Sequence, residues 1–249
     1  MNQLRVRISL SGIGLAACLV ALMSLALTTS LFGCKEARST AEATVVTAAA
    51  PQPQPQPAAV PVAPADTRPL LICFGDSLTA GYGTEPGEAY PDVLQQLLDA
   101  RGYHYHVLNS GISGNTTKDG LDRIARVIAR HPQLVVVEFG GNDGLRGLPL
   151  EQTQANLDSI VHQLQTSGAT VVLAGITLPP DYGPDYIKKF DAMYPALAKK
   201  YHTRLLPFLL KNVYGVPGDM QADDTHATAK GNKQVAANVQ ALIQPLLKH

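Results

Sequence analysis

A serine and a histidine that lie far apart in the chain have the types needed for nucleophilic catalysis. Ser77 follows an apolar run, LICF at 71–74, and the dipeptide Gly-Asp. A serine hydroxyl becomes a good nucleophile when a base takes its proton, and neutral imidazole, with an ordinary pKa near ~6.5, suits that role near neutral pH. His226 follows Asp223 and Asp224, either of which could orient the imidazole and stabilise the imidazolium. This set predicts acyl transfer through Ser77, whereas Ser77 alone could simply cap a helix.

Small polar residues and glycines also follow two other apolar segments. NSGISGN occupies 109–115 and GGND occupies 140–143. Taken singly, such residues are turn formers and helix caps more often than catalysts. Parallel strands of one sheet end at the same edge, and ligands bind at that edge in open α/β sheets. We therefore expect both stretches to lie near Ser77.

Alternating strand and helix patterns supply such a sheet. Short apolar runs predict strands at 70–74, 104–109, 134–139, 170–176 and 204–208. Three of these runs are nearly continuous, which is typical of parallel strands covered on both faces. Helical periodicity falls after them, at 88–101, 116–130, 150–166, 185–201 and about 228–247. The order predicts an α/β fold, a three-layer α/β/α sandwich around a five-stranded parallel sheet.

The composition favours a globular protein with a small or uncharged partner. The chain has 249 residues, 45% hydrophobic content and a formal net charge of zero, which suffices for one sizeable core but supplies no basic surface for nucleic acid. The histidines show no metal-ligand spacing, so we expect no metal and no cofactor. Of the three cysteines only Cys73 lies in a predicted strand, where we expect a core residue, and no disulfide framework is expected. We also expect a monomer.

The first 33 residues predict a signal peptide rather than part of the fold. Arg5 and Arg7 precede an uncharged, apolar stretch from Ile8 to Cys34, which is the order of a secretory signal. A transmembrane anchor is the competing interpretation, because this stretch is nearly long enough to span a bilayer. Its ending, LFGC at 31–34, resembles the bacterial lipobox, with Cys34 as the lipidated residue. Together with Lys35, the resemblance implies export to the periplasmic side of the envelope and attachment to the outer membrane.

A linker at 34–68 separates this segment from the predicted domain at 69–249. It contains PQPQPQP at 51–57 and further prolines at 61 and 64. Prolines at alternate positions exclude a helix and favour an extended polyproline II conformation. Fully extended at ~3.1 Å per residue, the linker would reach roughly 100 Å. It would act as a tether between a membrane anchor and the domain.

Four short blocks of the domain, in order, resemble the SGNH branch of the GDSL hydrolases. They are GDSL at 75–78, SGISGNTT at 110–117, GGND at 140–143 and the pair of Asp223 and His226. The resemblance covers about 70–247 and implies a flavodoxin-like SGNH fold. It implies Ser77, Asp223 and His226 as catalytic triad, which assigns the orienting role to Asp223 rather than Asp224. The implied oxyanion hole consists of the backbone N–H groups of Ser77 and Gly114 and the side-chain amide of Asn142.

Other segments resemble one subgroup of that family, the periplasmic multifunctional thioesterase I/protease I/lysophospholipase enzymes and related arylesterases. These segments are GGNDGLRG at 140–147, LPPDYG at 178–183 and YPALAKKY at 194–201. The subgroup implies hydrolysis of acyl esters or thioesters. It also implies an acyl groove lined by three leucines, Leu78, Leu145 and Leu178, although each could instead be ordinary loop packing. Two alternatives remain: an acetylesterase acting on envelope glycan, and a non-catalytic envelope lipoprotein.

The lipobox generates a prediction about Cys34. Cys34→Ser removes the thiol to which lipid would be attached, so metabolic labelling with a palmitate analogue should mark the wild type and not the variant. The variant should accumulate as an unprocessed or misplaced precursor, whereas a chain that begins at Asp66 should be soluble. An unlabelled wild type would remove the lipid anchor.

Overall fold

The computed structural model describes residues 66–248. The predicted signal peptide at 1–33, the lipidation site Cys34 and the linker up to residue 65 lie outside the described residues. Between residues 66 and 248, none of the helices has the length and apolar character needed to cross a membrane.

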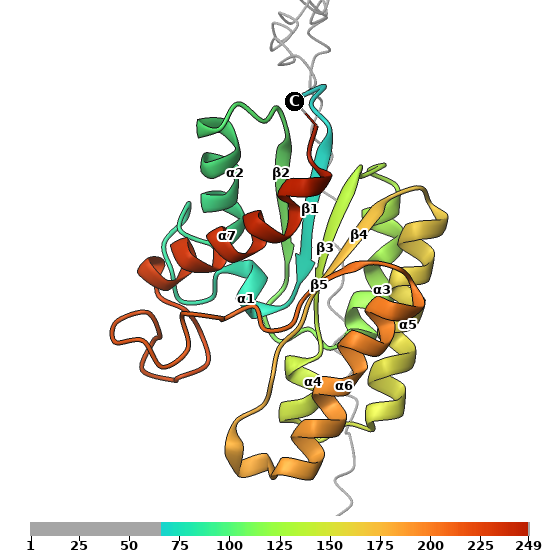
Figure 1. The fold of residues 1–249 in the computed structure, drawn as a ribbon, viewed down its shortest axis with the longest axis vertical. Coiled ribbons are helices and arrows are strands. Elements are labelled where there is room, and N and C mark those ends of the chain that lie inside the picture. Colours follow the sequence, from blue (N-terminus) through green and yellow to red (C-terminus); the bar gives the residue numbers. More distant parts are fainter. Residues whose placement is uncertain (1–65, 249) are drawn as a thin grey trace, which may run out of the picture. The chain divides into compact units, whose positions relative to one another are not determined.

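A single five-stranded sheet forms the centre of the domain, and all of its strand pairs are parallel (Figure 1). The spatial order is β2-β1-β3-β4-β5. The strands are β1 (Leu70–Gly75), β2 (His106–Gly111), β3 (Leu134–Glu138), β4 (Thr170–Ala174) and β5 (Arg204–Leu206). In this register Gly75 at the end of β1 pairs with Gly111 of β2 and with Glu138 of β3. The segments that follow these three strands therefore start side by side.

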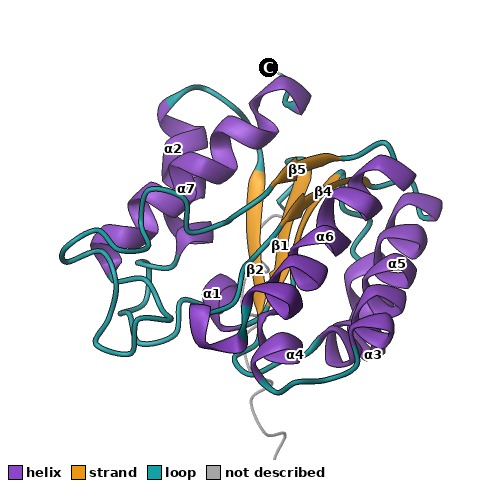
Figure 2. Ribbon diagram, turned by 60° about the horizontal axis from the view of Figure 1, so that its bottom comes forward, coloured by secondary structure: helices purple, strands orange, loops and turns teal. Residues whose placement is uncertain are grey.

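Helices cover both faces of the sheet, which confirms the predicted three-layer α/β/α architecture (Figures 1 and 2). α2 (Tyr90–Ala100) and α7 (Ala229–Ile243) pack against each other on one face. α3 (Thr117–Ile128), α5 (Leu150–Thr166) and α6 (Pro184–Lys200) lie on the other face. Each exposes one polar side and buries an apolar side against the strands, as expected of amphipathic surface helices.

The differences from the predicted elements lie at element ends and in very short helices. β2 continues to Gly111, two residues beyond its predicted end, and β5 stops at Leu206 because Pro207 has no N–H for the ladder. α7 ends at Ile243 and passes into a 3₁₀ turn that contains Pro245. The sequence did not predict α1 (Ser77–Ala80), α4 (Gly141–Leu145) or the 3₁₀ turn Pro180–Tyr182. These helices are too short to show a period.

The core is built on the central strands. Residues 71–74 of β1 are fully buried, and residues 134–137 of β3 are at most 2% exposed, so both strands are covered on both faces as their apolar runs predict. Fully burying one such aliphatic side chain stabilises a fold by about 1.5–3 kcal/mol. Cys73 is part of this core, as predicted: it is a free thiol whose pKa is raised to about 12 by burial.

Candidate active site

The GDSL segment forms the tight turn between β1 and α1. Gly75 ends the strand at a crowded position, because a Cβ there would lie 2.1 Å from the hydroxyl of Thr79 and 2.6 Å from the carboxyl of Glu138. Asp76 caps the one-turn helix α1, since its Oδ1 accepts a hydrogen bond from the backbone N–H of Leu78. Ser77 is the first residue of α1 and is half-buried. The turn therefore holds the Ser77 hydroxyl just beyond the end of β1.

The second segment of the site is the loop between β5 and α7. An isolated antiparallel bridge between Met220 and Ala227 closes this loop, and the backbone N–H of Gln221 donates to the carbonyl of His226. The Asp223 carboxylate accepts hydrogen bonds from the backbone N–H groups of Thr225 and His226, both at 3.0 Å. Asp223 thus fixes the backbone of the loop as well as touching the imidazole.

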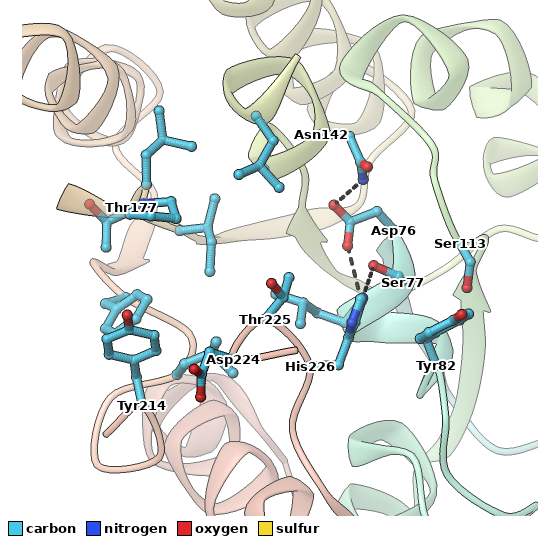
Figure 3. A pocket seen from close by; sticks show the side chains of 18 of the residues that line it. Asp76, Ser77, Tyr82, Ser113, Asn142, Thr177, Tyr214, Asp224, Thr225 and His226 are labelled. Carbon is cyan, nitrogen blue, oxygen red and sulfur yellow. Dashed lines mark hydrogen bonds between the residues drawn. The ribbon is translucent and has the colours of Figure 1, made fainter. Parts of the chain in front are cut away.

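Ser77, His226 and Asp223 form one continuous chain of hydrogen bonds. Nε2 of His226 lies 2.8 Å from Oγ of Ser77 (Figure 3). Nδ1 of the same ring lies 2.7 Å from Oδ2 of Asp223. The side chain of His226 is 16% exposed. The structure thus joins His226 to Asp223, as the family pattern implies, while Asp224 lines the neighbouring cavity.

The carboxyl of Asp223 is held in its ionised form. Partial burial opposes that charge, but the hydrogen bond from His226 and the two backbone N–H groups outweigh it, and the pKa of Asp223 is lowered to about 2. At neutral pH the carboxylate is therefore an acceptor only. It selects the His226 tautomer that carries a proton on Nδ1, which leaves Nε2 free to accept the proton of Ser77.

Asn142 and Gly114 reach the same edge from the other two strand ends. Asn142 is the second residue of α4, and its side-chain amide nitrogen donates to Oδ2 of Asp76 at 3.1 Å (Figure 3). The same nitrogen donates to the carbonyl of Asn115 at 3.0 Å. Gly114, between β2 and α3, has a φ of +79°, a conformation that favours glycine. Both amide protons of Asn142 thus already have acceptors around the serine turn.

Buried polar contacts fix the short helix that carries Asn142. Asp143, 2% exposed, accepts hydrogen bonds from the backbone N–H and the hydroxyl of Thr117 at the start of α3. Thr153 of α5 donates to the same carboxylate at 3.4 Å. Gly140, which precedes α4, has a φ of +119°. Asp143 therefore holds Asn142 in place against two long helices.

Arg123 of α3 joins the loops that follow β1 and β2. Its guanidinium donates to the carbonyls of Gly75 and Ser110 and to the side chain of Asn115, at 2.8–2.9 Å. It also lies over the ring of Phe74, 4.5 Å from the centroid. A planar group with five donors can make several such bonds at once. The sequence alone did not point to this residue, because its partners come from two other strands.

The Ser77 hydroxyl opens into a cavity of about 420 Å³ with largely apolar walls. All three leucines of the predicted acyl groove line it: Leu178 is buried, Leu78 is half-buried and Leu145 is 37% exposed. The sequence did not single out several further wall residues, which are Ile176, Thr177, Phe208, Leu210 and Tyr214. Residues 66–248 contain no group of three or more His, Cys, Asp or Glu side chains that could hold a metal ion.

The aromatic ring of Tyr82 lies against the imidazole of His226. The two ring centroids are 4.7 Å apart at an interplanar angle of 45°, and Tyr82 is 55% exposed. The Gln221 side-chain amide donates to the backbone carbonyl of Tyr82 at 2.7 Å, which ties the histidine loop to the segment after α1. Figure 3 shows Tyr82 and Ser113 on one side of Ser77 and His226, with Thr177 and Tyr214 on the other.

The sequence of this domain matches a known family over most of its length. Residues 73–234 match the GDSL-like lipase/acylhydrolase family, and the chain belongs to this family. It is 43% identical over 178 residues to Esterase TesA of Pseudomonas aeruginosa. The match covers 71% of this chain and 89% of the relative. It is 38% identical to Thioesterase 1/protease 1/lysophospholipase L1 of Escherichia coli K12, covering 75% of this chain and 88% of the relative. With relatives of this kind, the chain is a serine hydrolase of the GDSL family.

Solved structures share the fold. A crystal structure of TesA superposes with a TM-score of 0.69 at 43% identity, covering 72% of this chain and 99% of that chain. A structure of the psychrotrophic esterase EstA from Pseudoalteromonas sp., inhibited by monoethylphosphonate, gives a TM-score of 0.68 at 30% identity. The match covers 71% of this chain and 97% of that chain. The fold is therefore that of the SGNH hydrolases.

The hydrogen bonds of Asp223 generate a prediction about its titration. In the wild type its carboxyl should titrate with a midpoint of about 2. His226→Ala removes the ring N–H that stabilises the carboxylate, so the pKa should rise toward the ordinary value of an aspartate. Carbon-13 NMR of the side-chain carboxyl measures both midpoints. His104→Ala, a change at an exposed histidine, is the control and should leave the midpoint where it was. If Asp223 titrates with the same midpoint in His226→Ala as in the wild type, the imidazole does not stabilise the Asp223 carboxylate.

Proposed function

We propose that this protein is a serine esterase that hydrolyses carboxylic ester or thioester bonds of acyl substrates. The observation that carries the proposal is the hydrogen-bond chain from Asp223 through His226 to Ser77, which ends at the wall of an apolar cavity. Nucleophile, base and orienting carboxylate lie within hydrogen-bonding reach, as general-base activation of a serine requires. The named relatives, an esterase and a thioesterase, support the same chemistry.

In the acylation step Oγ of Ser77 attacks the substrate carbonyl carbon while Nε2 of His226 takes the hydroxyl proton. The imidazolium so formed is stabilised by the Asp223 carboxylate, which keeps its negative charge. Collapse of the tetrahedral intermediate breaks the bond to the alcohol or thiol, and Nε2 returns the proton to that leaving group. In deacylation a water molecule attacks the acyl-serine with His226 again as base, which releases the carboxylic acid and restores Ser77.

The developing oxyanion needs donors on the side of the carbonyl away from His226. We assign this role to the backbone N–H groups of Ser77 and Gly114 and to the side-chain amide of Asn142. The amide of Asn142 is already oriented by Asp76 and by the carbonyl of Asn115, so the oxyanion takes one of its protons in competition with that carbonyl. Because Asp76 fixes the orientation of this amide before the reaction, the oxyanion gains its hydrogen bond with little reorganisation.

The two sides of the site suit the two parts of an ester. The leaving group must accept a proton from His226, so it lies on the side that Tyr82 flanks. The acyl chain then extends toward Tyr214, on the side away from Tyr82 (Figure 3), in a cavity that Leu145 and Leu178 also line. A volume of about 420 Å³ falls within the range of small-molecule sites. Leu78, Leu145 and Leu178 thus act as substrate-binding residues in this proposal.

The first 68 residues support a proposal for the location of the enzyme in the cell. We propose export, lipidation of Cys34 and anchoring in the outer membrane on the periplasmic side, with residues 34–68 as the tether. This arrangement suits a monomeric enzyme whose acyl substrates occur at membranes. A lipid anchor on Cys34 would raise the concentration of the site near such substrates.

Removal of the nucleophile tests the assignment of the reaction. Ser77→Ala and His226→Ala should each lower kcat for p-nitrophenyl octanoate by on the order of 10⁴ to 10⁶, because the triad acts as a unit. Ser113→Ala changes another serine at the wall of the same cavity and is the matched control, which should keep activity near the wild-type level. Wild-type-like hydrolysis by Ser77→Ala would disprove the proposed mechanism.

Chain-length dependence tests the acyl groove. Leu145→Asp places a charge on the cavity wall, so an octanoyl ester should lose the contacts of two or three methylenes. At ~0.8 kcal/mol each, that loss lowers kcat/KM roughly 15- to 60-fold. The acetyl group of an acetate ester is too short to reach this wall, so the variant should hydrolyse that ester at nearly the wild-type rate.

The control for this variant is Leu148→Asp. Leu148 has the same 37% exposure as Leu145, but it does not line the cavity. This variant should hydrolyse both esters at wild-type rates. Equal losses on acetate and octanoate in Leu145→Asp would make Leu145 a packing residue. A wild type that strongly prefers acetate would favour the acetylesterase alternative.

A further inference from the structure

A fully buried acid, Glu138, lies directly beneath the serine turn. It is the last residue of β3 and has 0% exposure. Its Oε2 accepts a hydrogen bond from the hydroxyl of Thr79 at 2.9 Å and a longer one, 3.4 Å, from the backbone N–H of Asp76. Its other oxygen, Oε1, is buried and has no donor to accept from. The triad and the oxyanion donors do not include this group, so its place in the site needs an explanation.

Glu138 shares its environment with a second buried acid. Asp76 is 3% exposed, and its backbone N–H lies 3.4 Å from Oε2 of Glu138, which brings the two buried acids together. A hydrogen bond between two carboxyl groups requires a proton on one of them, because ionised carboxylates only accept. Within residues 66–248 no ion pair involves either acid, and the guanidinium of Arg123 bonds to carbonyls and to polar side chains instead. One proton shared by the pair therefore avoids two buried charges of the same sign.

The hydrogen bonds decide which acid carries that proton. Asp76 accepts from two N–H groups, those of Leu78 and of the Asn142 side chain, which stabilise its ionised form. Glu138 accepts one hydroxyl at normal length and is the deeper of the two. Burial raises the pKa of Asp76 to about 6. Burial and then the nearby Asp76 carboxylate raise the pKa of Glu138 well above its ordinary value.

The other groups around the pair do not change this assignment. Thr79 of α1 and Tyr90 of α2 face it on one side, with their hydroxyl oxygens 3.2 Å apart. Tyr194 of α6 faces it on the other side, and its hydroxyl donates to the carbonyl of Phe139. Burial raises the pKa values of both tyrosines well above normal, so they stay neutral. His226 also faces Asp76, and its positive form lowers the pKa of Asp76. Cys73 and Asp143 lie near the two tyrosines.

We propose that Glu138 is a positioning residue: as a neutral acid it donates a hydrogen bond to the Asp76 carboxylate and thereby fixes the group that orients the Leu78 N–H and the Asn142 amide. The proposal rests on the function assigned to Ser77 and Asn142 above. Glu138 touches no substrate atom and acts through Asp76. Its effect on the reaction is to keep the serine turn and an oxyanion donor in one geometry.

Two substitutions test whether Glu138 acts through a neutral hydrogen-bond donor, through a negative charge or only through the volume of its side chain. Glu138→Gln keeps a neutral donor of the same shape, so kcat for p-nitrophenyl octanoate should stay within about threefold of the wild type. Glu138→Leu keeps the volume but removes the donor. Because small misplacements of reacting groups are costly, its kcat should fall on the order of 10²-fold with little change in KM. A Glu138→Leu enzyme with wild-type kcat, or a Glu138→Gln enzyme as impaired as Glu138→Leu, would overturn the proposal.

The pH profile supplies a readout that a purely structural role would not move. If Glu138 is neutral, Glu138→Gln leaves the charge near Asp76 unchanged, and the acid limb of kcat/KM stays in place. If Glu138 were an anion, removing it would make the surroundings of Asp76 and of the base His226 less negative. That change would move the acid limb to lower pH, which would contradict the proposal. Glu138→Leu removes a donor to the carboxylate, so its limb should move to higher pH.

An infrared difference spectrum tests the protonation of Glu138 without any activity measurement. At neutral pH the spectrum of the wild type minus that of Glu138→Gln should contain the C=O stretch of a protonated carboxylic acid. Carboxylate bands in its place would overturn the proposal even if Glu138→Leu fails to fold. Failure of the proposed function would look different: Ser77→Ala would remain active while the carboxylic acid band was still present.

Discussion

One carboxylate, that of Asp76, joins the two elements on which the proposed chemistry depends. Oδ1 accepts the N–H of Leu78 and so closes the turn that carries Ser77, and Oδ2 accepts the side-chain amide of Asn142. Asn142 lies 66 residues after Asp76 in the chain, and the two partners Leu78 and Asn142 lie on the helices that follow β1 and β3. The proposed nucleophile and the proposed oxyanion donor are thus held relative to each other by a buried carboxyl group rather than by chain connectivity. Such a contact is worth much more in a dry site than at the surface.

The parallel sheet makes this contact possible. Because Gly75 pairs with Gly111 and Glu138, the chain leaves β1, β2 and β3 at the same level of the sheet. Small residues let the emerging turns approach: a Cβ on Gly111 would lie 2.2 Å from the backbone nitrogen of Ala80. Arg123 then ties the loops after β1 and β2 together through their carbonyls. The histidine loop comes from the other side and closes the site.

The fold could be predicted from the sequence because its signals are local. Continuous apolar runs identified β1 and β3, and the family blocks identified Ser77 and its partners before any contact was known. Asp223 and Asp224 could not be separated by residue type, and only the family pattern and then the 2.7 Å contact did so. Short helices such as α1 and α4 show no period, so their existence depends on capping and on tertiary contacts.

Residues that act through distant partners could not be predicted at all. In the sequence, Glu138 is one polar residue within the apolar run LVVVEF. Its proposed role depends on Asp76, which lies 62 residues earlier in the chain. Tyr82 contacts the imidazole of His226, and Gln221, 139 residues after Tyr82, donates to the Tyr82 carbonyl. Long-range contacts of this kind leave no periodic signal in a single sequence.

The most direct test of the central claim is covalent labelling of the nucleophile. A fluorophosphonate should react once with the wild type: the Ser77 Oγ–P bond forms, fluoride leaves, and intact-protein mass spectrometry shows a single adduct. Peptide mapping should place that adduct on Ser77, and Ser77→Ala should stay unmodified under the same conditions. An adduct on another residue, or a Ser77→Ala protein labelled as fast as the wild type, would contradict the account.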